Sequence, residues 1–280
     1  MAASADTPVY RGMTRAEVDA GYNNRAAFTD SDDWIAGWSR RSKPVRSRAG
    51  VRLDLRYAGA PRALFDYFPC GVANAPLFMF FHGGYWHRNH KDMFGFVAEG
   101  PLAAGLNVAN VGYTLAPEAR VSEIVGEARA ATDYLVSQAS QLGYDPARII
   151  VGGWSAGAHL AAMLLDHPAT AGGLLISGLY DLEPVLFCNV NDVIALTDDE
   201  AERLSPMKTV GTGSIPLCVA YGDRELPEFQ RQSIDFAAVC AGLGYPVEAL
   251  PAPGHHHFSI LDELSAPDGI LVNALRKLIA

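Results

Sequence analysis

The sequence predicts an α/β fold: a mostly parallel sheet of about eight strands with helices on both faces. From residue 77 onward, short apolar runs alternate with longer segments of helical periodicity, which is the pattern of buried parallel strands joined by crossover helices. The chain has 280 residues, of which 49% are hydrophobic, so it can bury a large core. No shift in composition marks a boundary between two domains. We therefore expect one large domain.

Residues 1–45 are expected to form an arm that packs on a main domain of residues 46–280. Helix-like patches occur at 15–22 and 32–38, but no core-facing period runs through the segment. The main domain opens with an alternating strand at 51–57. The Gly59-Ala60-Pro61 break and a second strand at 62–68 follow, which predicts an antiparallel hairpin.

Strands and helices then alternate along the rest of the chain. The strands are predicted at 77–81, 107–111, 148–151, 173–177, 217–221 and 247–250. The helices are predicted at 93–104, 118–142, 155–165, 228–243 and 268–279. The segment 181–206 breaks the alternation because it is long, acidic and irregular, so we expect a small cap or a long loop there.

Charge and hydropathy exclude several classes of function. A formal net charge of -9 contradicts a nucleic-acid-binding surface, which requires a basic patch. The longest apolar runs are too short to cross a bilayer, and the N-terminus lacks the apolar core of a secretory signal. The four cysteines lack metal-ligand spacing and are expected to be reduced. We predict a soluble, cytoplasmic protein with neither nucleic-acid nor membrane partners, and no signal for an oligomeric state.

The stretch Gly153-Trp154-Ser155-Ala156-Gly157 contains the candidate nucleophile, Ser155. It lies between a predicted strand and a predicted helix, which is the context of a nucleophile elbow. In that turn a strained backbone exposes the serine hydroxyl, and the flanking glycines let strand and helix pack closely. The alternative is a glycine-rich connection in which the serine only caps the helix.

A serine hydroxyl becomes a nucleophile when a histidine takes its proton and a carboxylate orients that histidine. In this strand order the acid and then the histidine follow the serine along the chain. Asp223 follows the strand at 217–221, and His257 ends a run of three histidines after the strand at 247–250. We predict these two residues as partners of Ser155. The alternatives are Asp181 and Glu225 as the acid, and His255 and His256 as the base.

The motif His82-Gly83-Gly84-Tyr85-Trp86 follows the strand at 77–81 and predicts an oxyanion hole. We expect the backbone N–H groups of Gly84, Tyr85 and Ala156 to bind the developing negative charge. His82, His87 and His90 offer an alternative metal cluster, but the glycines and the separate nucleophile favour a site without metal.

Aromatic residues next to these motifs indicate a small-molecule site that accepts a flat ring. Tyr85, Trp86 and Trp154 are the predicted substrate contacts, and Tyr22 and the pair Leu186-Phe187 could approach from the arm and the cap. The alternative for each is ordinary packing beside the sheet.

Together these motifs resemble the kynurenine formamidases, or arylformamidases, of the α/β-hydrolase fold, which are relatives of the hormone-sensitive-lipase-like esterases. The resemblance implies a triad of Ser155, Asp223 and His257 and hydrolysis of N-formyl-L-kynurenine to kynurenine and formate, without a metal or organic cofactor. The main rival is a carboxylesterase acting on small or aromatic esters. A metal-dependent amidase and a non-catalytic binding module are rivals from different classes. The resembling segments are HGGYW at 82–86, SAGAHL at 155–160, GLYDL at 178–182, LSP at 204–206 and HF at 257–258.

Overall fold

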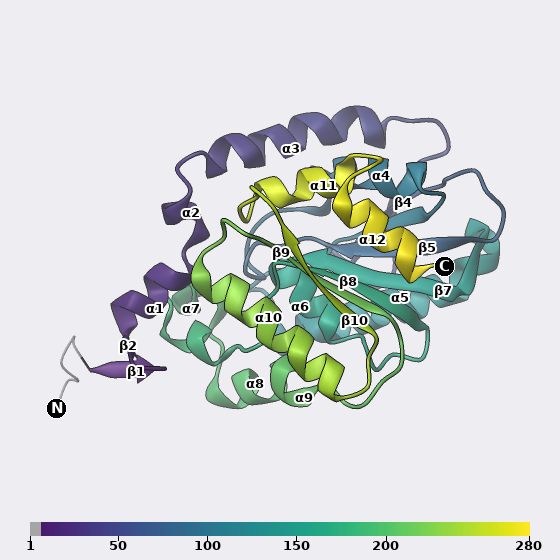
Figure 1. Ribbon diagram of the computed structural model, residues 1–280. Helices are drawn as coiled ribbons and strands as arrows, with labels where there is room; N and C mark the ends of the chain where they lie inside the picture. Colours follow the sequence, from purple (N-terminus) through teal and green to yellow (C-terminus); the bar gives the residue numbers. More distant parts are fainter. Residues whose placement is uncertain (1–6) are drawn as a thin grey trace.

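The computed structural model describes residues 7–280, and its centre is an eight-stranded sheet (Figure 1). The strand order is β10-β9-β8-β7-β5-β6-β4-β3. Only β4 runs antiparallel to its neighbours in this sheet, and every other pair is parallel, as the sequence predicts. The strands are β3 (Arg52–Arg56), β4 (Leu64–Phe68), β5 (Ala75–Phe81), β6 (Asn107–Val111), β7 (Tyr144–Trp154), β8 (Thr170–Ile176), β9 (Leu217–Gly222) and β10 (Val247–Ala252).

The central strands are apolar throughout because helices cover both faces of the sheet. All seven residues of β5 are buried, and their side chains alternate between two hydrophobic clusters. Leu77, Met79 and Phe81 belong to one cluster, whereas Phe78 and Phe80 belong to the other. This alternation follows from the two-residue period of a strand.

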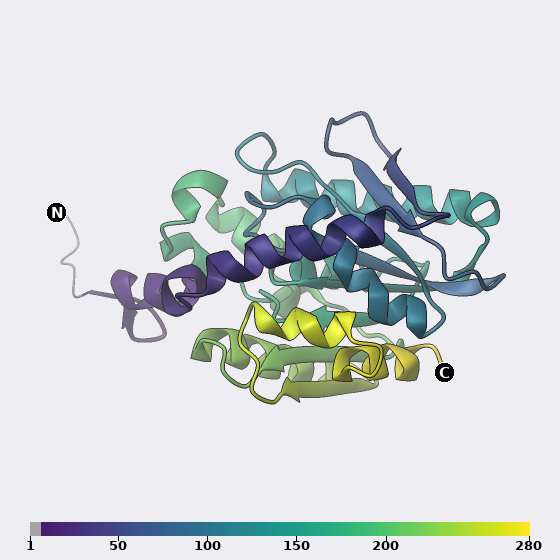
Figure 2. The same ribbon diagram turned by 90° about the horizontal axis from the view of Figure 1, so that it is seen from above.

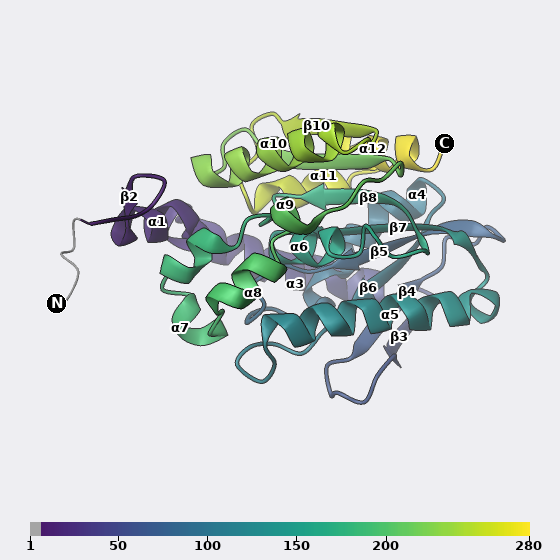
Figure 3. The same cartoon turned by 90° about the horizontal axis from the view of Figure 1, so that it is seen from below.

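One face is covered by α5 (Val121–Leu142), α6 (Ala156–Ala162) and α10 (Pro227–Gly242), which Figure 3 shows from below. The other face is covered by α3 (Ser31–Arg46), η1 (Lys91–Ala98), α4 (Glu99–Ala103), η3 (Ser259–Leu261), α11 (Asp262–Ser265) and α12 (Ile270–Leu278). In Figure 2 the purple helix α3 runs across this face. The layered arrangement brings the carboxyl ends of β5, β7, β9 and β10 to one edge.

The N-terminal segment contains two short strands and three helices, and it contributes to the core. Thr14 and Glu17 form a capping box that begins α1. Trp38 of α3 is fully buried, with its ring 5.2 Å from that of Trp154 and 6.0 Å from that of Phe258. The segment therefore packs directly behind the strand that leads to Ser155. Its elements are β1 (Pro8–Tyr10), β2 (Met13–Thr14), α1 (Arg15–Tyr22), α2 (Asn24–Ala27) and α3.

The irregular segment between β8 and β9 folds into short helices beside α1 (Figure 1). Asn189 bonds to the Asp19 carboxylate through its backbone N at 2.7 Å and its side-chain Nδ2 at 2.8 Å. This region and the arm therefore contact each other at the sheet's carboxyl edge. The helices are η2 (Glu183–Phe187), α7 (Asn191–Ile194), α8 (Asp198–Arg203) and α9 (Pro206–Thr209). Across residues 7–280, no helix combines the length and the apolar character needed to span a membrane.

Candidate active site

Ser155 lies at a sharp turn between β7 and α6. Its φ of 58° and ψ of -123° are strained for a residue with a side chain. The turn is anchored because the Ser155 backbone N donates to the Ile176 carbonyl of β8 at 2.8 Å. This is the strand–turn–helix geometry expected for a nucleophile elbow.

The glycines on either side of Ser155 allow the backbones to cross closely. A Cβ atom on Gly157 would lie 2.0 Å from the Phe81 carbonyl oxygen, and one on Gly153 would lie 2.4 Å from the Gly157 carbonyl. Neither position has room for a side chain. The glycines therefore bring α6 against the end of β5, where the His82-Gly83-Gly84 loop begins.

His257 lies on the loop after β10, where it is 3% exposed. Its ring lies between those of Trp154 and Phe229, with centroid distances of 4.8 Å and 4.7 Å. The indole Nε1 of Trp154 donates to the His257 carbonyl at 2.7 Å. Ser155 and His257 line the same pocket, so the structure brings together the predicted nucleophile and base.

The predicted acid requires a correction, because Glu225 rather than Asp223 faces the histidine. Glu225 Oε1 is 3.7 Å from His257 Nδ1, and its side chain is fully buried. Asp223 is exposed, and its Oδ1 accepts from Gly254 N at 2.7 Å. After β9 ends at Gly222 the chain turns outward, so Asp223 points into the loop and Glu225 returns beneath the histidine.

Neither Glu225 nor His257 uses all of its hydrogen-bonding atoms on other residues, so a hydrogen bond can form between them. The hydroxyl of Ser177 donates to Glu225 Oε1, while Glu225 Oε2 and His257 Nδ1 have no hydrogen-bond partner within residues 7–280. A separation of 3.7 Å is longer than a hydrogen bond, and such contacts often tighten when substrate binds.

The alternative acid and bases have other partners. Asp181 accepts from the Tyr10 hydroxyl at 2.7 Å. His255 Nε2 lies 3.1 Å from Glu263 Oε1, and the His256 ring stacks on Phe28 at 4.6 Å.

The loop after β5 passes directly beside the serine. A Cβ atom on Gly83 would lie 2.9 Å from Ser155 Cβ. Gly84 and Tyr85 line the pocket with φ values of 121° and 49°. Within residues 7–280 their backbone N–H groups donate no hydrogen bond, and Ala156 N begins α6, where amides have no acceptor inside the helix. These three N–H groups are thus free to bind an oxyanion.

Of the predicted aromatic contacts, Tyr85 and Trp154 line the pocket, as does Tyr22 from the arm. The Tyr85 hydroxyl donates to the Tyr22 carbonyl at 2.6 Å. The prediction for Trp86 is wrong: it is fully buried and donates from Nε1 to His159 Nδ1 at 3.2 Å. Its neighbour Tyr85 takes the position on the pocket wall. Leu186 and Phe187 pack against the core and do not line the pocket.

The three histidines of the alternative metal cluster do not converge within the described part of the chain. His82 is buried between the rings of Phe94 and Tyr113, and its burial lowers its pKa to about 3. His87 Nε2 accepts from Arg88 Nε at 3.2 Å. Asp54, Asp66 and Asp92 do lie together, but the Lys91 ammonium occupies the space between them.

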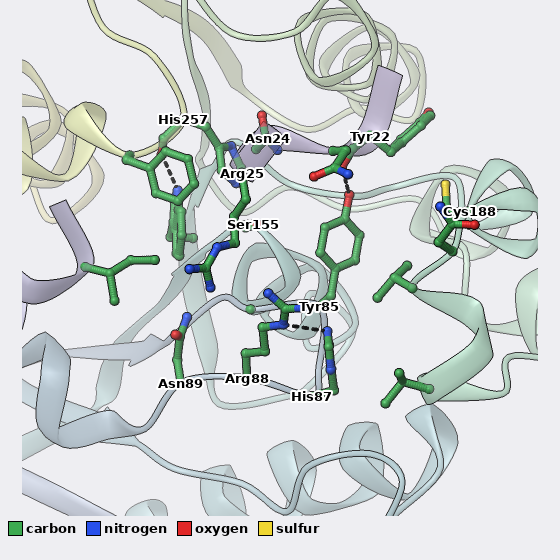
Figure 4. Close-up of a pocket in the computed structure, with 18 of the residues that line it drawn as sticks. Tyr22, Asn24, Arg25, Tyr85, His87, Arg88, Asn89, Ser155, Cys188 and His257 are labelled. Atoms are coloured by element: carbon green, nitrogen blue, oxygen red, sulfur yellow. Dashed lines mark hydrogen bonds between the residues drawn. The ribbon is translucent and has the colours of Figure 1, made fainter. Parts of the chain in front are cut away.

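The pocket has a volume of about 250 Å³ and contains residues that sequence reasoning missed. Figure 4 shows Arg25 and Arg88 entering it from opposite walls, with Ser155 and His257 on one side and Tyr22 and Tyr85 on the other. Arg88 could have been found because it is two residues beyond the glycine-rich motif. Arg25 could not, since its place depends on how the arm packs.

Known proteins resemble this chain in sequence and in structure. A family model described as the alpha/beta hydrolase fold matches residues 78–210. A kynurenine formamidase from Danio rerio is 32% identical over 291 residues, covering 96% of this chain and 98% of that protein. A carboxylesterase of Mycobacterium tuberculosis is 34% identical over 101 residues, or 36% of this chain and 32% of that protein. A crystal structure from Silicibacter sp. TM1040, for which a thioesterase function has been suggested, superposes with a TM-score of 0.82 and 30% identity, covering 92% of this chain and 98% of that one.

Proposed function

This chain belongs to the kynurenine formamidase family of α/β-hydrolases, and from that membership we propose that it hydrolyses arylformamides of the N-formylkynurenine type through an acyl-enzyme on Ser155. It is a hydrolase that acts on small acyl substrates, like its formamidase and carboxylesterase relatives. The proposal adds the substrate and the residues that act on it.

In the proposed reaction the Ser155 hydroxyl attacks the formyl carbonyl while the His257 imidazole takes its proton. Glu225 holds the imidazole by its Nδ1 and stabilises the positive charge. The N–H groups of Gly84, Tyr85 and Ala156 bind the carbonyl oxygen as it becomes negative. When the C–N bond breaks, His257 gives its proton to the departing aryl nitrogen. A water that His257 deprotonates then attacks the formyl ester, and formate leaves as Ser155 regains its proton.

The observation that carries the proposal is the meeting of the strained Ser155 turn, the His257 ring and the unpaired amides of the 82–86 loop at one pocket. The buried carboxylate of Glu225 on the far side of His257 supports the assignment of the base. Tyr22, Tyr85 and Trp154 on the pocket walls support a substrate with an aromatic ring.

The test measures both products from N-formylkynurenine, with formate and kynurenine expected in equal amounts. A serine-directed phosphonate should label the peptide that contains Ser155 and stop turnover. The Ser155→Ala variant is the control and should take up no label there. Labelling of the wild type at another serine with loss of turnover would contradict the assigned nucleophile.

A carboxylesterase activity is the second candidate, and the similarity to the Mycobacterium tuberculosis carboxylesterase favours it. An acyl-enzyme route cleaves esters as well as formamides. The ratio of kcat/KM for formanilide to that for 4-nitrophenyl acetate distinguishes the two, because a formamidase should retain substantial activity on the less reactive amide.

We also infer a cytoplasmic location. The four cysteines support this inference. All four are free thiols, as is usual for proteins of a reducing compartment.

A further inference from the structure

The pocket around Ser155 carries more positive than negative charge, although the whole protein has a formal charge of -9. Among the residues that the structure describes, its walls include Arg25 and Arg88 but only one carboxylate, that of Asp19. Both oxygens of Asp19 already accept hydrogen bonds from Asn189. A negatively charged group that enters this pocket can therefore bind the arginines, because the one carboxylate of the pocket wall is already hydrogen-bonded elsewhere.

The two arginines differ in what already binds them. Arg25 forms an ion pair with Asp32. Arg88 makes no ion pair with any carboxylate in the described residues 7–280, and its Nε donates to His87 Nε2 at 3.2 Å. Burial, and then the positive charge of Arg88, lower the pKa of His87, which keeps that ring neutral and able to accept this bond. The two terminal nitrogens of the exposed Arg88 guanidinium are left for a ligand.

The backbone that carries Arg88 is held firmly against the proposed oxyanion loop. Arg88 N donates to the Gly84 carbonyl at 3.0 Å, and a Cβ atom on Gly84 would lie 2.6 Å from the Arg88 carbonyl oxygen. The next residue, Asn89, donates from Nδ2 to the Gly83 carbonyl at 3.0 Å. The Arg62 guanidinium donates to the Asn89 carbonyl at 2.7 Å. The guanidinium therefore extends from a fixed base beside the point where the scissile carbonyl would bind.

We propose that Arg88 is a specificity-determining residue that binds a carboxylate on the substrate, so that the preferred substrates are acyl compounds bearing a free carboxylate beyond the scissile bond. The proposal rests on the proposed function of the Ser155 site. A guanidinium presents two parallel N–H groups that match the two oxygens of a carboxylate. Arg88 has no carboxylate partner within residues 7–280 to give up when it binds such a group.

The experiment uses two pairs of substrates in which one member carries a free carboxylate and the other does not, and only the ester pair is otherwise matched. The formamide pair is N-formylkynurenine and neutral formanilide, and the ester pair is mono-4-nitrophenyl glutarate and neutral 4-nitrophenyl butyrate. Arg88→Gln should lower kcat/KM for the charged member of each pair about 10- to 100-fold, mainly through KM, because a lost charge-assisted hydrogen bond has that effect on binding. The neutral members should change less than about threefold, and added salt should weaken the wild-type preference.

Two further variants sharpen the test. Arg52→Gln removes the same charge from an exposed residue of β3, outside the pocket, and should leave all four activities unchanged. Arg88→Lys keeps the charge without the fork and should recover only part of the preference.

Equal losses on charged and neutral substrates, or no loss on either, would overturn the role of Arg88. A larger selective loss for Arg25→Gln than for Arg88→Gln would overturn it too. If the wild type cleaves neither formamide but Arg88→Gln still loses activity selectively on the charged ester, the formamidase proposal fails while the carboxylate inference stands.

Discussion

Two cations that are three residues apart serve opposite purposes in this molecule. Lys91 is 1% exposed, and its Nζ lies 2.6 Å from Asp54, 2.6 Å from Asp66 and 2.9 Å from Asp92. Arg88 lies at the pocket and pairs with no carboxylate in residues 7–280. Within four residues, the chain pairs the charge of Lys91 with carboxylates of other elements and leaves the charge of Arg88, which lines the pocket, without such a partner.

The same contrast holds for the wider surroundings of the two cations. Asp66 of β4 also accepts from the Arg46 Nε of α3 at 2.8 Å, so the Lys91 cluster joins α3, the sheet and η1. The pocket side instead leaves His257 Nδ1, Glu225 Oε2 and the amides of Gly84 and Tyr85 without hydrogen-bond partners among residues 7–280. Buried polar groups cost stability when they are unpaired. The comparison predicts that changes in the cluster alter stability and that changes in the pocket alter turnover.

The largest effect on the pocket side should come from Ser155→Ala. Loss of the proposed nucleophile should reduce kcat by on the order of 10⁴-fold or more, because little chemistry remains without an acyl-enzyme. Thermal unfolding should occur near the wild-type temperature, since alanine keeps the Cβ atom and therefore the same backbone strain at this position. Normal turnover by this variant would contradict the proposed role of Ser155.

The next effect separates two acids in the same turn. Glu225→Gln should lower kcat about 10³- to 10⁴-fold, because an amide can no longer stabilise the positively charged imidazole of His257. Asp223→Asn should change kcat less than about threefold, since its side chain only closes a loop by accepting from Gly254 N. Steady-state kinetics on one formamide measures both, and the reverse order of effects would restore Asp223 as the acid.

On the cluster side, Lys91→Met should lower the free energy of unfolding by about 3–5 kcal/mol. Removing one member of a buried ion cluster leaves the carboxylate of Asp66 buried with less compensating charge. Denaturant unfolding measures the loss, and the folded variant should keep its kcat. Lys277→Met breaks the exposed pair with Glu248 and is the matched control, with little change expected.

A further prediction is a pH dependence of stability that comes from two buried histidines outside both the Lys91 cluster and the pocket lining. Burial lowers the pKa of His159 to about 4 and that of His82 to about 3, against about 6.5 in an unfolded chain. Between about pH 6.5 and pH 4 the unfolded chain therefore binds more protons than the folded one, so the free energy of unfolding should fall as the pH falls. Urea unfolding at several pH values measures the slope.

A matched variant isolates one of the two groups. His159 Nδ1 accepts from Trp86, and its Nε2 donates to the Leu204 carbonyl at 2.8 Å. Glutamine can make both bonds without titrating, so His159→Gln should show a shallower slope whatever its absolute stability. An unchanged slope would show that this histidine does not carry the effect.

The sequence predicts the sheet better than it predicts the site. The strand at 107–111 is observed with the same bounds, because an apolar run between turn residues has few alternatives in a parallel sheet. The carboxylate that faces His257 could not be predicted from order alone, since Asp223 and Glu225 both follow β9. The choice depends on Gly222, where a Cβ would lie 2.2 Å from the His255 carbonyl, so the loops meet closely and the turn carries Asp223 outward.

The arm shows the same limit in another form. The patch at 32–38 predicts part of a helix, but α3 continues through the basic residues to Arg46. Basic residues stand between Trp38, Ser42 and Val45 in the sequence and obscure their helical period. These three residues are buried because α3 packs against η1. Tyr85 and Trp86 are adjacent aromatic residues, and the sequence does not distinguish which of them faces the pocket. The structure does, because Trp86 packs against His159 and Tyr85 lines the pocket.

The burial of Trp38 has a consequence for how the chain is made. A ribosome releases this indole early, yet its ring partners Phe94, Trp154 and Phe258 emerge far later, the last of them near the C-terminus. The Trp38 side chain therefore lacks these partners until residue 258 has been made. An N-terminal truncation would spare the nascent chain this delay, but it would leave a hole beside Trp154, the residue before Ser155.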